Sequence, residues 1–121
     1  MKWMISAVAL LCAAGARADG LRWAERDNGR DIAWEDAKTY CSGKGWRLPE
    51  IGELETLFGG RVPARLHLTG PWFWSATEVG PDEARDPEDV AWGVVRANGV
   101  RTQNLRPIAY HARALCVRSP S

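Results

Sequence analysis

The sequence predicts an α+β domain in which two early helices pack on a mostly antiparallel sheet. Apolar side chains recur at helical spacing twice, first over 34–41 and again over 51–58. After Pro71 the chain changes to short apolar runs separated by turn residues, which is typical of antiparallel strands. Helices that come before a run of strands indicate an α+β layout.

The first eighteen residues have the pattern of a secretory signal peptide. A basic residue precedes an apolar run over 4–14, and residues 16–18 give an A-x-A cleavage sequence. The run is too short for a permanent membrane anchor. Lipid attachment at Cys12 is disfavoured because a leucine precedes this cysteine, where a small residue is needed. We therefore expect residues 1–18 to be removed, leaving 19–121 as one secreted or periplasmic domain.

The mature chain has almost no net charge. Without the two basic residues of the leader, 16 Lys and Arg become 14, against 15 Asp and Glu, so the net charge is −1. No overall charge attracts such a chain to nucleic acid or to an anionic membrane. An electrostatic partner must therefore bind a local patch.

Cys41 and Cys116 are the cysteines that remain after cleavage. Two cysteines in an exported chain predict one disulfide, and a reactive pair is disfavoured because no C-x-x-C sequence is present. Such a disulfide would close a loop of 116 − 41 = 75 positions. In the chain-entropy account, closing a loop of that length stabilises the folded state by about 4 kcal/mol. The bridge would hold the first helix against the last strand and bring the two chain ends together.

The expected elements follow in order along the mature chain. A strand over 21–24 leads through a turn at Asn28-Gly29 to the first helix, for which Asp31 is a candidate cap. Pro49 suits the first position of the second helix, which ends at Gly59-Gly60. An irregular connection follows, and then the expected strands: 71–77, 90–96, 100–105 and 113–118.

The order of several short motifs resembles one family. The motifs are Trp34-Glu35-Asp36-Ala37 to Tyr40-Cys41, Gly45-Trp46-Arg47-Leu48-Pro49, Glu53-Leu54, Phe73-Trp74-Ser75 and Cys116-Val117-Arg118. Together they resemble the Lcl C-terminal domain family, named after a bacterial collagen-like adhesin and similar to C-type-lectin-like folds. The resemblance implies an exported module, often a binding module, and in the namesake adhesin the domain is associated with sulfated polysaccharide. This chain departs from the family in lacking a collagen-like repeat and in carrying Glu50 where members usually have Thr or another capping residue.

Aromatic and arginine side chains supply the candidate ligand site. We expect Trp34, Trp46 and Trp74 in the core, and Trp72 as an exposed aromatic anchor. The strongest hairpin signal, Asn98-Gly99, has three arginines in or beside it: Arg96, Arg101 and Arg106.

Arg96 and Arg101 flank this turn symmetrically, so we expect them to be neighbours across the ladder. Two adjacent guanidinium groups repel unless an anion or an acidic partner lies between them. The alternative is that a carboxylate from the acidic loop over 78–89 neutralises them.

Signals for metal binding and catalysis are weak. The acidic loop offers the oxygen ligands that calcium prefers, but the tripeptides of calcium-dependent lectins are absent, so a solvated loop is favoured. His67 and His111 lack metal-ligand spacing, and Ser75 lies in no nucleophile elbow. The sequence thus predicts neither an enzyme nor a cofactor.

Two functions remain open. The first is an exported, non-catalytic binding module for a sulfated or acidic polysaccharide or an envelope protein. The second is a structural or assembly subunit of a pilus or envelope complex without glycan binding. Fold is inherited more safely than ligand from a resemblance of this kind.

Overall fold

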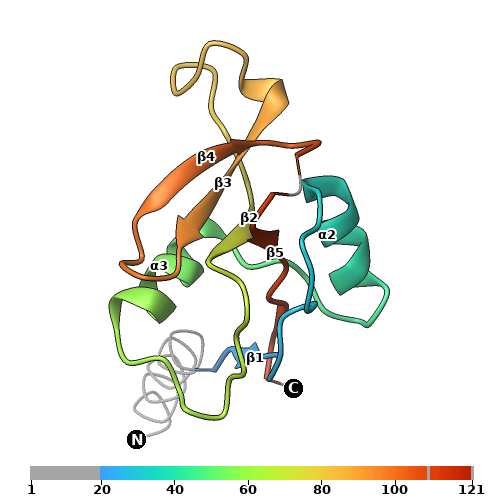
Figure 1. Cartoon of the computed structure of the whole chain (residues 1–121), viewed down its shortest axis with the longest axis vertical. Coiled ribbons are helices and arrows are strands. Elements are labelled where there is room, and N and C mark those ends of the chain that lie inside the picture. Colours follow the sequence, from blue (N-terminus) through green and yellow to red (C-terminus); the bar gives the residue numbers. More distant parts are fainter. Residues whose placement is uncertain (1–19, 109, 121) are drawn as a thin grey trace, which may run out of the picture.

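A computed structural model of the chain describes residues 20–108 and 110–120. The predicted signal peptide and its cleavage point lie outside these residues. The elements are β1 (Arg22–Trp23), α2 (Trp34–Ser42), α3 (Ile51–Gly59), β2 (Trp72–Glu78), the 3₁₀ turn η1 (Pro87–Asp89), β3 (Val90–Val95), β4 (Arg101–Leu105), β5 (Ala112–Arg113) and β6 (Val117–Arg118). The α+β prediction is confirmed (Figure 1). Over the described range, no helix has the length and apolar character needed to cross a membrane.

The larger sheet has the strand order β4-β3-β2-β5 and lies between the two helices (Figure 1). Its pairs are antiparallel except β2 with β5, which is parallel. Because side chains alternate along a strand, Trp74 packs with α2 on one face and Phe73 packs with α3 on the other. Trp72, two residues before Trp74, packs on the same face as Trp74.

The smaller sheet joins the two ends of the described chain. Strand β1 pairs antiparallel with β6, and Arg47 forms a further bridge to Val117 through two backbone hydrogen bonds of 2.8 and 2.9 Å. The predicted disulfide is present: Cys41 on α2 bonds to Cys116, 75 positions later, with their Cα atoms 5.5 Å apart. The early helix is therefore tied to the segment that enters the last strand.

Helix α3 begins at Ile51, two residues later than the proline signal predicts, and β2 completes its cap. Glu50 is the N-cap residue, and its N–H donates to the Glu53 carboxylate at 2.8 Å. The Ile51 N–H donates to the Thr77 hydroxyl at 2.8 Å, and this hydroxyl donates to the Glu50 carboxylate at 2.9 Å. A threonine from a neighbouring strand thus serves the helix start, where the family resemblance implied a local one.

Two local predictions are wrong. Asp31 does not cap α2, because Ala33 occupies the N-cap position and the Asp31 carboxylate accepts a hydrogen bond from Arg113 Nε at 3.0 Å. The strand expected over 113–118 is instead the two short strands β5 and β6. Between them the chain crosses from one sheet to the other, and Ala114 is held there by both the backbone and the side chain of Asn28.

Candidate functional site

The hairpin between β3 and β4 does not pair the two arginines that the sequence placed together. Arg101 lies opposite Val94, and the turn is a four-residue loop over 96–99, closed by the Gly99 N–H donating to the Val95 carbonyl at 2.8 Å. Gly99 has φ 70°, a left-handed conformation that favours glycine. The predicted cross-strand neighbourhood of Arg96 and Arg101 is therefore wrong.

Arg101 and Arg106 are held by contacts within the chain. Arg101 donates two hydrogen bonds of 2.6 Å to the Glu55 carboxylate, and these bonds hold the pKa of Glu55 below its ordinary value. For Arg101 the neutralising carboxylate therefore comes from α3, whereas the sequence pointed to the loop over 78–89. Arg106 does pair with Glu78 of that range, at 3.5 Å. The Arg106 side chain is only 18% exposed; its Nε donates to the Val90 carbonyl and its guanidinium stacks 4.3 Å from the Trp34 ring centroid.

Trp72 is packed, although the sequence suggested an exposed anchor. Its ring meets Trp74 edge to face at 4.8 Å between centroids, and its Nε1 donates to the Thr102 hydroxyl at 2.5 Å. Trp34 and Trp74 are buried as predicted, with 2% and 0% exposure. Trp46 is only half-buried.

A large hollow in the described surface lies at the other end of the molecule, beside β1 and β6. It is a groove of about 890 Å³. Three aromatic side chains line it: Trp23, Tyr40 and Trp46. Cys116 of the disulfide also lines it, so the groove forms where the two chain ends meet α2. We call this hollow the end groove.

Two arginines lie directly opposite each other along the end groove. In the ladder between β1 and β6, Arg22 is the register partner of Arg118. Residues directly opposite in an antiparallel pair hold their Cβ atoms roughly 5 Å apart on the same face. The bridge between Arg47 and Val117 places Trp46 on the other side of Arg118, whose guanidinium lies 4.4 Å from the Trp46 ring centroid. A row of Arg22, Arg118 and Trp46 therefore crosses three neighbouring segments.

Further cations surround this row. Arg26, Lys44 and Arg65 line the same groove, and Glu25 is the single acidic residue among its described lining. Lys44 Nζ lies 5.0 Å from the Tyr40 ring centroid. Within residues 20–108 and 110–120, ion pairs involve Lys38, Arg47, Arg101, Arg106 and Arg113, none of which lines the end groove.

The cross-strand pair of Arg22 and Arg118 destabilises the isolated chain and is suited to binding an anion. Like charges directly opposite across a ladder destabilise a sheet. A sulfate or carboxylate between two guanidinium groups removes that repulsion and accepts hydrogen bonds from both. The half-buried aromatic rings alongside offer apolar faces at the rim. The end groove can therefore bind an anionic group next to a ring.

The sequence predicts part of this site. Arg22 lies in the first expected strand and Arg118 in the last, and the predicted disulfide brings the chain ends together. What was missing is the pairing of those two strands, which puts Arg22 opposite Arg118. No family model matches the chain.

Proposed function

We propose that this protein is an exported, non-catalytic binding module of the Lcl C-terminal, C-type-lectin-like type, and that its end groove binds a sulfated or acidic polysaccharide. The observation that carries the proposal is the cross-strand pair of Arg22 and Arg118, which has no carboxylate partner among the described residues. The disulfide supports secretion or a periplasmic location, because such bonds persist in oxidising compartments.

Charge and shape favour a polymer with repeated anionic groups. Five cations line one open groove, so several sulfates or carboxylates along a chain can be bound at once. Each exposed contact contributes little by itself, and together they give binding that weakens as salt rises. The aromatic rings of Tyr40 and Trp46 add apolar faces against which sugar rings can pack.

Heparin affinity chromatography of the mature protein tests this proposal, with heparin as the sulfated polysaccharide. The groove variant is Arg22→Thr/Arg118→Thr, in which threonine keeps the strand preference. The matched control is Arg96→Thr/Arg101→Thr, which removes two arginines from the hairpin that the sequence favoured. We expect the wild type and the hairpin variant to elute at similar salt, and the groove variant to elute much earlier.

Thermal unfolding separates a binding role from a structural one. If Arg22 and Arg118 repel, removing both should leave stability unchanged or raise it by a few tenths of a kcal/mol, after allowing for the lost contact with Trp46. The hairpin variant should instead lose a little stability with the ion pair to Glu55. Absence of heparin retention in the wild type, or equal retention of wild type and groove variant, contradicts the proposal.

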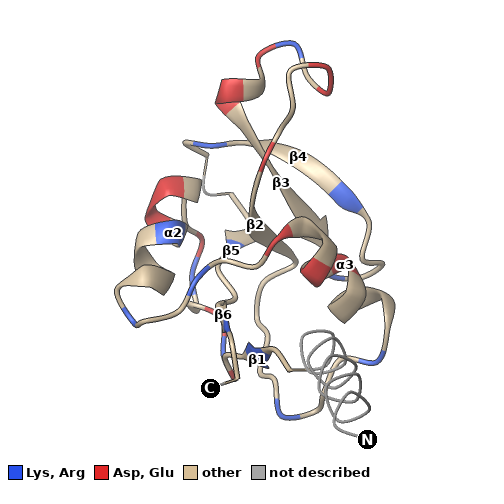
Figure 2. Cartoon of the chain, turned by 180° about the vertical axis from the view of Figure 1, so that it is seen from behind, with Lys and Arg blue, Asp and Glu red and all other residues tan. Residues whose placement is uncertain are grey.

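The second function, an assembly subunit, is favoured by one separate observation. Several acidic residues lie at the end of the molecule opposite to β1 and β6, beside which the end groove lies (Figure 2). This segregation of charge is the basis of the inference that follows.

A further inference from the structure

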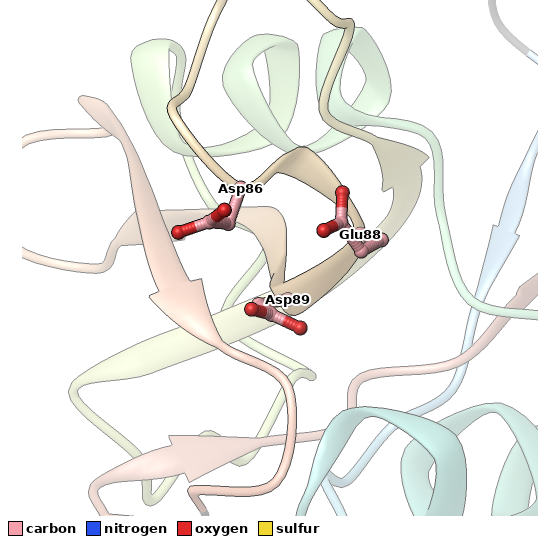
Figure 3. A group of neighbouring side chains, drawn as sticks. All are labelled: Asp86, Glu88 and Asp89. Carbon is pink, nitrogen blue, oxygen red and sulfur yellow. The ribbon is translucent and has the colours of Figure 1, made fainter.

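An acidic projection extends beyond β2 and β3. We call residues 79–89, which include η1, the acidic lobe. Three of its exposed carboxylates, on Asp86, Glu88 and Asp89, bring their oxygens within 4.8 Å of one another (Figure 3). Asp82 and Glu83 add negative charge, against which the lobe carries one cation, Arg85. Because like charges repel, the lobe is best neutralised by a cationic partner.

The acidic lobe and the end groove lie at opposite ends of the longest axis of the molecule (Figures 1 and 2). The lobe follows β2 and leads into β3, while the groove forms around β1 and β6 in the other sheet. A lobe in this position does not reach the groove of its own chain. The molecule therefore presents two complementary charge clusters. Among the described residues, no carboxylate of the lobe and no cation of the end groove takes part in an ion pair.

We propose that the acidic lobe of one copy binds in the end groove of a second copy. This rests on the end groove being the anion site proposed above. The contact is heterologous, since two different surfaces meet, and each pair of molecules still has a free groove at one end and a free lobe at the other. Such contacts produce open head-to-tail chains unless the rotation between copies closes a ring.

Charge complementarity selects a second copy as the occupant. The carboxylates of Asp86 and Glu88 are exposed and project from a narrow loop, so they can enter an open groove without rearrangement of the sheet. In the groove they meet Arg22 and Arg118, and both like-charge clusters are relieved by one contact. The contact area is limited to the lobe, so the interface belongs to the small, transient class and depends strongly on salt.

The same groove then serves two ligands that exclude each other. A polysaccharide bound along the arginines displaces the lobe of the neighbouring copy, so saturating polysaccharide separates the head-to-tail assembly into single copies. Without polysaccharide the copies associate, and each open assembly keeps one free groove at one end. Assembly and glycan binding are in this way alternative states of one site.

Analytical ultracentrifugation of the mature protein at low ionic strength, about 0.01 M, where charges act over ~30 Å, is the test. The groove variant is Arg22→Thr/Arg118→Thr, and the lobe variant is Asp86→Asn/Glu88→Gln/Asp89→Asn. We expect the wild type to sediment as larger species with rising concentration, and each variant alone to associate at least tenfold more weakly. An equimolar mixture of the two variants should form one-to-one dimers and nothing larger, because only one intact lobe and one intact groove can meet.

Several results would overturn the proposal. These are a wild type that stays monomeric at low salt, a variant that associates as the wild type does, or a mixture that stays monomeric. Association that requires added calcium and persists in the groove variant would assign the carboxylates to a cation. Heparin chromatography of the lobe variant distinguishes failure of the two proposals. If the lobe variant and the wild type are retained equally but the wild type does not self-associate, the assembly proposal fails and the polysaccharide proposal stands.

Discussion

Replacing Gly93 by alanine should strongly destabilise the larger sheet. Gly93 lies opposite Trp74 in the ladder between β2 and β3, and it is buried. A Cβ atom there would overlap both the Trp72 ring and the carbonyl oxygen of Phe73. A flexible side chain could move away, but a strand carbonyl cannot move without separating the paired strands.

The expected cost follows from these obstructing atoms. Overpacking a core costs roughly 1–3 kcal/mol, and a backbone obstruction places Gly93→Ala at the upper end, about 3 kcal/mol. For a domain of this size each kcal/mol lowers the melting temperature by roughly 4–8 °C, so we expect a fall of at least about 12 °C. Gly52→Ala is the matched control, because a Cβ there has nothing within 4 Å and α3 should gain about 0.5–1 kcal/mol.

Thermal unfolding followed by circular dichroism measures both variants. The additional change Trp72→Leu in the Gly93→Ala background should recover part of the loss, because it removes the ring but leaves the Phe73 carbonyl in place. If Gly93→Ala has the same melting temperature as the wild type, Trp72 does not lie over β3 and the described register of the two strands is incorrect. Equal changes in melting temperature for Gly93→Ala and Gly52→Ala would likewise contradict the close packing around Gly93.

Three further predictions concern the rest of the chain. Replacing Cys41 and Cys116 together by alanine should lower the free energy of unfolding by about 4 kcal/mol in a denaturant titration, and two alkylatable thiols in the native exported protein would contradict the bridge. Mass spectrometry of the exported protein should find Asp19 at the N-terminus, and an intact Met1 would refute cleavage. Burial raises the pKa of Asp27, but hydrogen bonds from Thr69, Gly29 and Gly70 outweigh burial and hold that pKa below its ordinary value. Because the pKa of Asp27 is lower in the folded state, its ionised form stabilises the fold above the unfolded pKa of about 4, and this stabilisation is lost as pH falls through the folded pKa. The melting temperature of Asp27→Asn should therefore fall less below pH 4 than that of the wild type.

The helices and the disulfide were predictable because their signals are local or compositional. Spacing of apolar residues gives a helix wherever it lies in the fold, and two cysteines in an exported chain leave one pairing. The surroundings of Trp72 were not predictable in this way. Whether its ring is exposed depends on Gly93 and Thr102, which come from two other strands.

The hairpin shows how a correct local signal can give an incorrect neighbourhood. Asn98-Gly99 does form a turn, with Gly99 in the left-handed conformation that the sequence suggests. A two-residue turn would bring Arg96 and Arg101 close across the ladder, whereas the four-residue loop pairs Arg101 with Val94. Both turns accept the same Asn-Gly pair, so the choice between them depends on how β3 and β4 pack against α3.

The face on which Arg22 and Arg118 lie is predictable from the sequence, but their pairing across the ladder is not. Trp23 and Val117 point toward the core, so the alternation of a strand sends Arg22 and Arg118 to the outer face. A slip of one residue would bury an arginine, which fixes the register once the two strands are known to pair. The pairing of β1 with β6 depends on the tertiary structure. The disulfide helps to hold β6 in place, because Cys116 lies two residues before Arg118 and is bonded to Cys41 on α2. The end groove therefore depends on the bridge, and its affinity for an anion should fall when the disulfide is reduced even if the larger sheet stays folded.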